Sequence, residues 1–458
     1  MESDPDVDVM ELIDSQRVSG AQITIVVLCG LIAVLDGLDL QAIGLAAPAM
    51  AAALHIAPQA LGSVFSAALA GLAVGAFGLG LAADRIGRKR VLIGSILCFG
   101  VFTLCTAFAS SMNDLLIVRF CTGLGLGGAM PSFISLGAEY VPRRLRATVV
   151  SALWTGFPIG GVIGGLLAAR LIPQWGWPSI FWVGGTLPLL LAAALAFVLP
   201  ESIGFLVNRN ASPQRIARLL ERVCPGAHRS PRARFVLSEE RAPGVPVRHL
   251  FNVGRGVGTV LLWVSFFIAF MMLVTNSAWS PTLLRAEGIE VAQSAIAMAT
   301  FNFGSVIGTS LAGWLISRLG VVAVLPLSCI GGAVAIGSVG YAAHWVLLVT
   351  LLEGLFGLFL GCASSGLIVL ATLFYPTAIR STGVGWSMGM GRIGSFTGPL
   401  VVGALVAARW PTASVFVAVG VPGLVAALTT ALVGLRYGRA EVAAVPAAGA
   451  LLRLNEAL

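Results

Sequence analysis

Long uncharged apolar runs follow one another along most of this chain of 458 residues. About 20 apolar residues are enough for a helix to span a bilayer. The pattern predicts twelve such helices, over 20–47, 59–83, 91–110, 114–138, 147–170, 179–199, 256–280, 291–316, 321–341, 345–369, 382–408 and 412–435. The runs lack the two-residue alternation of membrane β-barrels, and a lipid-exposed backbone must satisfy its own hydrogen bonds. We therefore expect an all-α membrane protein.

Polar segments divide the chain into parts. We expect a disordered N-terminal tail over 1–19, a first six-helix half over 20–199 and a linker loop over 200–253. A second six-helix half over 254–435 and a C-terminal tail over 436–458 would follow. The first segment is acidic, whereas a cleavable signal peptide begins with basic residues, so we do not expect residues 1–19 to be such a signal.

Composition and charge narrow the class of protein. Hydrophobic residues make up 57% of the chain and charged residues only 10%, against about 25% charged in soluble domains. A soluble enzyme is therefore excluded. A net charge of +8 could indicate nucleic-acid binding, but 23 of the 28 basic residues fall in the segments that share the side of the N-terminus, against three on the other side and two within helices. The positive-inside rule then places both termini in the cytoplasm, and no nucleic-acid partner is expected. The seven cysteines form no CxxC pair, so neither a metal site nor a disulfide framework is indicated.

The two halves repeat each other at an offset of about 234 residues, as in transporters built from parallel repeats. The matching positions are Arg119 with Glu353, Gly123 with Gly357, Gly127 with Gly361, Pro142 with Pro376, Gly160 with Gly394 and Gly164 with Gly398. The spacing of Gly123, Gly125 and Gly128 also satisfies a dinucleotide-binding pattern, but no strand precedes it. We interpret these glycines as a helix-packing face.

Several motifs resemble the major facilitator superfamily. Residues 80–90 (GLAADRIGRKR) are similar to its signature loop between helices 2 and 3, and residues 116–125 (LIVRFCTGLG) to its helix-4 arginine motif. Residues 35–44 (LDGLDLQAIG) resemble the DGxD element of its aromatic acid:proton symporter family, and residues 374–385 and 391–399 are also similar to that family. The resemblance covers roughly residues 20–435.

The resemblance implies twelve transmembrane helices in two pseudo-symmetric halves. It also implies proton symport of a small aromatic carboxylate, of the hydroxybenzoate or hydroxyphenylpropionate type, by alternating access in the bacterial inner membrane. The proton gradient would drive import, and no cofactor and no obligate protein partner are expected.

Five ionisable residues lie deep in the predicted helices: Asp36, Asp39, Arg119, Glu353 and Arg392. Each costs about 2.5–3.5 kcal/mol at a helix centre, so each is expected to face a cavity or a partner. A structural ion pair that only locks helices together is the alternative to a transport site. Glu353 has a third reading, in which its side chain snorkels to the outer interface.

Asp36 and Asp39 are three residues apart and share a helix face. Mutual repulsion favours protonation of one of the two carboxylates, which proton coupling requires. Asp36 lies about 24 Å from the inner end of its predicted helix, and Arg119 about 8 Å from the outer end of its own. We predict that Asp36 pairs with Arg119 and that Asp39 is its neighbour.

Arg392 lies about 15 Å into its predicted helix, near the membrane midplane. A guanidinium there suits a substrate carboxylate, so Arg392 is the first candidate for an anion anchor and Arg119 the second. Asn276, Asn302, Trp386 and Trp154 are candidates for contacts to an aromatic ring. Packing or an interfacial position is the alternative for each tryptophan.

The resemblance also implies a cytoplasmic gate around residues 84–90. Asp84 would accept from the start of the helix near Arg380, while the arginines pair with Glu139 or Glu201. The predicted gating residues are Asp84, Arg85, Gly87, Arg88, Glu139 and Arg380. In the alternative reading the basic residues of this loop only set topology.

Other functions remain to be distinguished. A drug:proton antiporter of the same superfamily would raise drug tolerance, and residues 156–161 (GFPIGG) are faintly similar to the antiporter motif. A channel would need a selectivity-filter loop or a ring of like charges. A membrane-embedded enzyme would need a nucleophile or metal constellation, and a nutrient sensor a long folded tail.

Overall fold

The computed structural model describes residues 6–209, 211–224, 234–236, 247–252 and 254–437. Its contacts divide the chain into two compact units, Met1–Ala242 and Pro243–Leu458, here called unit 1 and unit 2. Twelve of the described helices are long and apolar enough to cross a membrane. The predicted all-α fold class is therefore confirmed.

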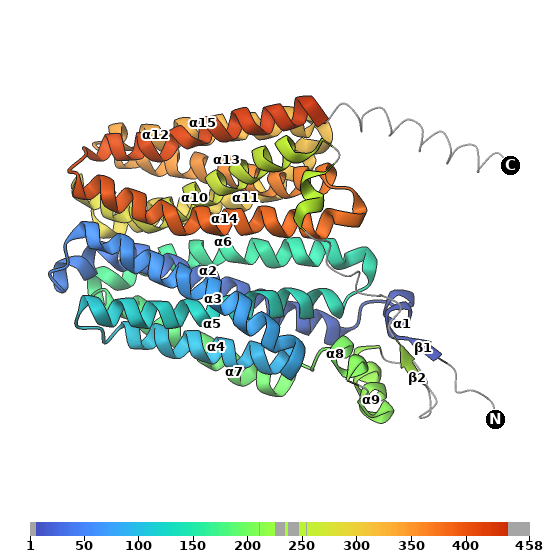
Figure 1. Cartoon of the computed structure of the whole chain (residues 1–458). Helices are drawn as coiled ribbons and strands as arrows, with labels where there is room; N and C mark the ends of the chain where they lie inside the picture. Colours follow the sequence, from blue (N-terminus) through green and yellow to red (C-terminus); the bar gives the residue numbers. More distant parts are fainter. Residues whose placement is uncertain (1–5, 210, 225–233, 237–246, 253, 438–458) are drawn as a thin grey trace, which may run out of the picture. The chain divides into compact units, whose positions relative to one another are not determined.

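Unit 1 is a bundle of six long helices, and most of its short elements lie at one end of the bundle (Figure 1). The long helices are α2 (Gly20–Ala53), α3 (Leu61–Ile86), α4 (Arg88–Thr106), α5 (Met112–Glu139), α6 (Arg143–Trp175) and α7 (Pro178–Val198). The short elements are β1 (Asp6–Asp8), α1 (Val9–Ser15), η1 (Pro58–Ala60), α8 (Ile203–Asn208), α9 (Pro213–Val223) and β2 (Arg234–Val236). The strongest helix contacts are α3 with α5, α2 with α6, α4 with α5 and α4 with α7.

Unit 2 repeats this arrangement. Its elements are η2 (Val247–Phe251), α10 (Gly256–Ala286), α11 (Val291–Leu319), α12 (Val321–Val339), η3 (Gly340–Ala342), α13 (Val346–Phe374), α14 (Thr377–Ala407) and α15 (Thr412–Tyr437). The contacts of α11 with α13, α10 with α14 and α12 with α15 match the three corresponding contacts of unit 1. The sequence repeat is thus a repeat of helix packing.

Glycines bring paired helices into backbone contact. A Cβ atom added at Gly123 would lie 1.9 Å from the carbonyl oxygen of Ala68, and one at Gly71 would lie 2.0 Å from that of Phe120. The same holds in unit 2, where a Cβ at Gly357 would lie 1.8 Å from the carbonyl oxygen of Phe301. The interpretation of the α5 glycines as a packing face is confirmed, and only a residue without a side chain fits there.

The expectation of a disordered N-terminal tail is wrong for the described residues 6–19. Asp8 caps α1 by accepting from the backbone N–H of Met10 at 2.8 Å. Leu12 and Ile13 of α1 are buried in the same apolar cluster as Ile216 and Leu220 of α9. The acidic residues of this segment are interspersed with apolar ones at helical spacing, so the segment has a face that can be buried.

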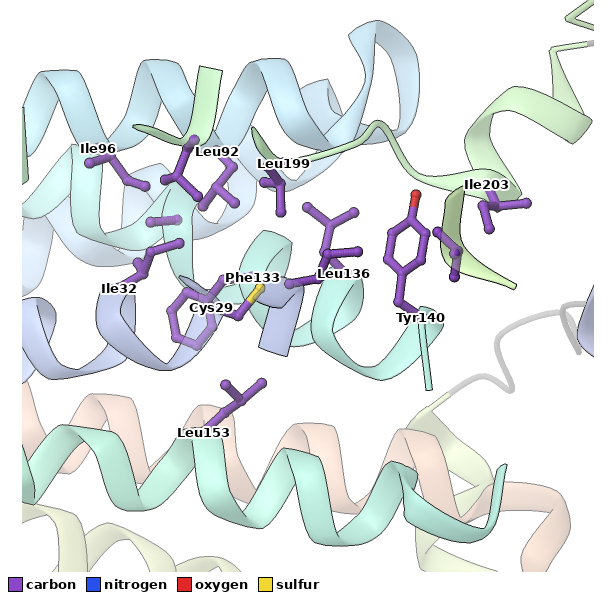
Figure 2. Close-up of a cluster of buried hydrophobic side chains, with 14 of the residues drawn as sticks. Cys29, Ile32, Leu92, Ile96, Phe133, Leu136, Tyr140, Leu153, Leu199 and Ile203 are labelled. Atoms are coloured by element: carbon purple, nitrogen blue, oxygen red, sulfur yellow. The ribbon is translucent and has the colours of Figure 1, made fainter. Parts of the chain in front are cut away.

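The region 200–253 is also more ordered than a loop where it is described. It contains α8, α9, β2 and η2, and β1 pairs with β2 in parallel, with Val7 opposite Phe235. The apolar core of unit 1 continues into this region. Figure 2 shows Leu199 and Ile203, which follow α7, beside Leu136 and Tyr140 at the end of α5.

Candidate functional site

A buried ion pair joins α2 to α5 inside unit 1. Arg119 Nη2 lies 3.1 Å from Asp39 Oδ2, and Arg119 Nη1 donates to Asp39 Oδ1 at 3.4 Å. Thr103 of α4 also donates to Asp39 Oδ1, at 2.7 Å. Both charged side chains are 0% exposed. Three helices therefore meet at one carboxylate, where the low dielectric strengthens the attraction between the charges.

The prediction that Asp36 pairs with Arg119 is wrong, because the carboxylate that bonds Arg119 is Asp39. Asp36 is buried as well, at 3% exposure. The two aspartates differ by about 4.5 Å along the helix axis. The predicted start at residue 20 agrees with α2, so the depth of each aspartate was known, and what the sequence does not give is the register of α2 against α5. Estimates of depth could not decide between the two.

A buried acid also lies in unit 2, at the repeat position of Arg119. Glu353 of α13 is 0% exposed and accepts from Asn276 Nδ2 at 2.8 Å and from Ser280 Oγ at 2.6 Å, both on α10. The reading in which Glu353 snorkels to an interface is wrong, since its carboxylate is enclosed and hydrogen-bonded. Asn276, a predicted contact for the substrate ring, thus uses its amide nitrogen to donate to the Glu353 carboxylate.

The remaining predicted binding residues lie on three different helices, α6, α11 and α14. Asn302 is buried in α11 and donates to the carbonyl of Met298 at 2.8 Å, within its own helix. Trp386 of α14 is 46% exposed and stacks on Trp263 of α10, with ring centroids 5.8 Å apart. Trp154 of α6 and Arg392 of α14 are half-buried.

The turn between α3 and α4 is tied to the rest of unit 1. Arg88 Nη1 lies 3.1 Å from Glu139 Oε2 at the end of α5, as the resemblance implies. Glu139 also accepts from Ser202 Oγ at 2.8 Å and from the N–H of Gly204. Glu201 Oε1 accepts from the N–H of Lys89 at 2.9 Å. These contacts, here called the turn network, join α4 and α5 to the segment after α7.

Gly87 and Tyr140 shape the turn network. Gly87 has φ +108°, which favours glycine, and a Cβ atom there would lie 2.5 Å from Glu201 Oε2. The Tyr140 hydroxyl donates to the carbonyl of Glu201. Burial, with the charges of Glu139 and Glu201, raises the pKa of Tyr140 well above its ordinary value, so the phenol stays a donor.

Two other predicted gating residues take part in hydrogen bonds between a side chain and a backbone carbonyl. The carbonyl of Arg85 accepts from Arg209 Nη2 at 2.6 Å, and Arg380 Nε donates to the carbonyl of Tyr375 at 3.3 Å. The side chain of Asp84 lies outside the described residues. A role for any of these residues in gating stays a prediction.

Thr103, Ser280, Ser202 and Tyr140 hold the charged residues in place, and the sequence reasoning missed them. Hydroxyl groups in apolar helices mostly bond to a carbonyl of their own helix, as Thr122 does with Val118. No sequence signal therefore separates the few that reach another helix. Among the described residues, no three His, Cys, Asp or Glu side chains gather into a site that could hold a metal ion.

Comparison with known proteins reveals a family match over most of the chain. Residues 29–299 and 261–453 match the Major Facilitator Superfamily. The D-xylose-proton symporter has a similar solved structure, with a TM-score of 0.70 at 18% identity, covering 89% of this chain and 97% of that one. That likeness concerns the fold.

Three relatives are similar in sequence over nearly their whole length. The 4-hydroxybenzoate transporter PcaK of Pseudomonas aeruginosa is 38% identical, over 93% of this chain and 96% of that protein. The gallate transporter of Pseudomonas putida is 35% identical, over 97% and 98%. The 3-(3-hydroxy-phenyl)propionate transporter of Escherichia coli is 35% identical, over 90% and 94%.

Proposed function

The chain belongs to the major facilitator superfamily, and from that premise we propose that it imports a small aromatic carboxylate together with protons. The names of its relatives support the substrate class, because 4-hydroxybenzoate, gallate and 3-(3-hydroxy-phenyl)propionate all combine a carboxylate with a hydroxylated ring. The class of transporter favours alternating access in the bacterial inner membrane, with both termini in the cytoplasm.

The observation that carries proton coupling is the enclosed pair of Asp39 and Arg119. A proton on Asp39 would cancel one of two charges that face each other at 0% exposure. Arg119 would then be a buried cation without its counter-charge, which is unfavourable until another anion replaces it. A carboxylate substrate is such an anion. Proton binding and substrate binding thereby favour each other, which is the thermodynamic requirement for symport.

Other residues of the chain complete the proposal. Asp36 is the second carboxylate on the Asp39 face of α2, one turn away. Arg392 in α14 is the proposed anchor for the substrate carboxylate, because a guanidinium binds a carboxylate in a bidentate fork. Asn302, Trp154 and Trp386 are proposed contacts for the ring and its hydroxyl groups.

Uptake by the purified protein in proteoliposomes tests this function. With radiolabelled 4-hydroxybenzoate outside and an acidic exterior, we expect accumulation that a protonophore abolishes. In Asp39→Asn, gradient-driven accumulation should fall by at least about tenfold, because the proton site is lost and a buried pair is broken. Glu287→Gln is the matched control, since it makes the same change of charge at an exposed residue.

Accumulation that ignores the protonophore in the wild type would exclude proton coupling. If expressing cells instead gain tolerance to lipophilic drugs and take up none of the three acids, the drug:proton antiporter is the correct function.

A further inference from the structure

Glu353 differs from Asp39 in the charge of its partners. Asp39 bonds a cation, Arg119, which occupies in unit 1 the repeat position that Glu353 occupies in unit 2. The two partners of Glu353, Asn276 and Ser280, are both uncharged. Unit 2 therefore holds a fully buried acid without an ion pair in the part of the chain that the structure describes.

Among the described residues, the elements around Glu353 contribute no ion-pair partner to it. Helix α13 contacts α10, α11, α12, η3 and α14. The ionisable side chains of α13 and these elements, Glu353 aside, are Arg285, Arg318, Cys329, Tyr341, Cys362, Arg380 and Arg392. Among the described residues, none of them forms a hydrogen bond or an ion pair with Glu353, whose polar contacts are Asn276 and Ser280. Arg285 lies five residues beyond Ser280, in the last turn of α10.

The hydrogen bonds are compatible with both the ionised and the protonated acid. An ionised carboxylate accepts only, whereas a protonated one both donates and accepts. Ser280 can serve either form, because a hydroxyl donates or accepts according to its rotation, and the 2.6 Å distance from Ser280 Oγ to Glu353 Oε1 suits an O–H···O bond in both directions. Asn276 continues to donate to Glu353 Oε2 in both forms. The proton can thus be held without loss of a hydrogen bond, while the bare charge would be buried uncompensated.

We infer that Glu353 is a second proton-binding site, in unit 2, that holds a proton in the conformation described here and exchanges it during transport. The inference rests on the proposed proton symport. Both hydrogen-bond partners lie on α10 and the acid lies on α13. A shift of one helix along the other would therefore change the stability of the bound proton, which couples its release to a conformational change.

Infrared difference spectroscopy tests the bound proton without any transport. The wild-type protein at neutral pH should show the carbonyl stretch of a protonated carboxylic acid, and Glu353→Gln should lack it. Glu287→Gln, at an exposed residue, should keep the band. Because glutamine has the shape of the protonated acid, the variant is expected to fold. A spectrum in which Glu353→Gln removes no such band would overturn the inference, whatever the protein transports.

The coupling part is tested by the proton-to-substrate ratio, measured from the membrane potential at which net uptake reverses. The ratio should fall by about one in Glu353→Gln, while exchange of labelled for unlabelled substrate continues. Ser280→Ala keeps the acid and removes its hydroxyl partner, so its pH profile of uptake should shift while the ratio is kept. An unchanged ratio in Glu353→Gln would reduce Glu353 to a structural hydrogen-bond acceptor. If the wild-type protein shows no proton-coupled uptake, the proposed function is refuted, whereas the infrared evidence for a proton on Glu353 is unaffected.

Discussion

At the scale of single residues, the two units differ in the partners that surround the buried ionisable residue at one repeat position. Arg119 is neutralised by Asp39, while Glu353 is surrounded by neutral donors. In unit 1 the cost of burial is offset only as long as both charges are present. The pair therefore makes a stability prediction that does not depend on transport.

Replacement of one member of the pair should destabilise unit 1. We expect Asp39→Asn and Arg119→Gln each to lower the free energy of unfolding by about 3–5 kcal/mol, since each leaves one buried charge uncompensated. The double variant should recover much of that loss, because both charges are gone. A thiol-reactive dye can follow thermal unfolding of unit 1, since Cys29 is buried in its apolar core and reacts when that core opens.

The double variant also gives the outcome that would contradict this stability prediction. If its loss of stability equals the sum of the two single losses, the residues do not interact energetically and the pairing has no role in stability. Glu287→Gln should unfold like the wild type.

Sequence reasoning identified the charged residues of the site but not their partners. Asp39, Arg119 and Glu353 are recognisable because an ionisable group is costly within an apolar run. The choice between Asp36 and Asp39 depends on the register of α2 against α5, which is set by packing. The hydroxyl donors Thr103 and Ser280 carry no pattern that distinguishes them from other buried hydroxyls.

At the scale of elements, all twelve long helices were predictable, whereas their predicted C-terminal ends differ from the structure by one to six residues. The predicted end of the first helix falls just before Pro48, yet α2 continues through this proline to Ala53, since membrane helices tolerate proline. The helix pairs approach each other most closely at glycines. Lipid is as apolar as leucine, so close contact has to supply the attraction.

Added volume at these contacts should separate the helices. Gly123→Ala and Gly357→Ala place a methyl group within 2 Å of a carbonyl oxygen on the neighbouring helix, and we expect each to cost about 1–3 kcal/mol or more. Gly94→Ala and Gly389→Ala are matched controls, because a Cβ atom there meets nothing within 4 Å. Thermal unfolding in detergent measures the difference.

Equal unfolding midpoints for Gly123→Ala and Gly94→Ala would show that α3 and α5 can move apart at no cost, and the close approach would then have no energetic importance.

At the scale of the whole molecule, unit 1 carries an additional layer made from two distant segments. The N-terminal segment and the region after α7 are joined by the strand pair, the apolar contacts of α1 and α9, and the hydrogen bond from Ser19 Oγ to the carbonyl of Val223, 2.6 Å long. The acidic composition of the N-terminal segment predicted disorder instead. The apolar face of α1 spans only two turns, which is too short to give a clear helical pattern in the sequence. Asp14 also pairs with Arg143 at the start of α6, at 3.4 Å.

Disruption of α1 should loosen this layer and leave the long helices in place. Leu12→Asp introduces a charge into a buried cluster and should speed cleavage by trypsin at Arg215, Arg218 and Arg222 of α9 severalfold, because local opening exposes the backbone to the protease. Glu11→Gln, on the exposed side of α1, is the control. Cleavage at the wild-type rate in Leu12→Asp would show that α9 holds its place without α1.

The turn network also contains the only lysine in the sequence. Lys89 is half-buried, and its Nζ donates to the carbonyl of Ala196 at the end of α7 at 2.8 Å. An amine-directed reagent thus meets a single side-chain target in the whole chain, at the junction of α3, α4 and α7. The natural sequence therefore supplies its own labelling site, and the rate at which Lys89 reacts reports on the opening of that junction without any engineered residue.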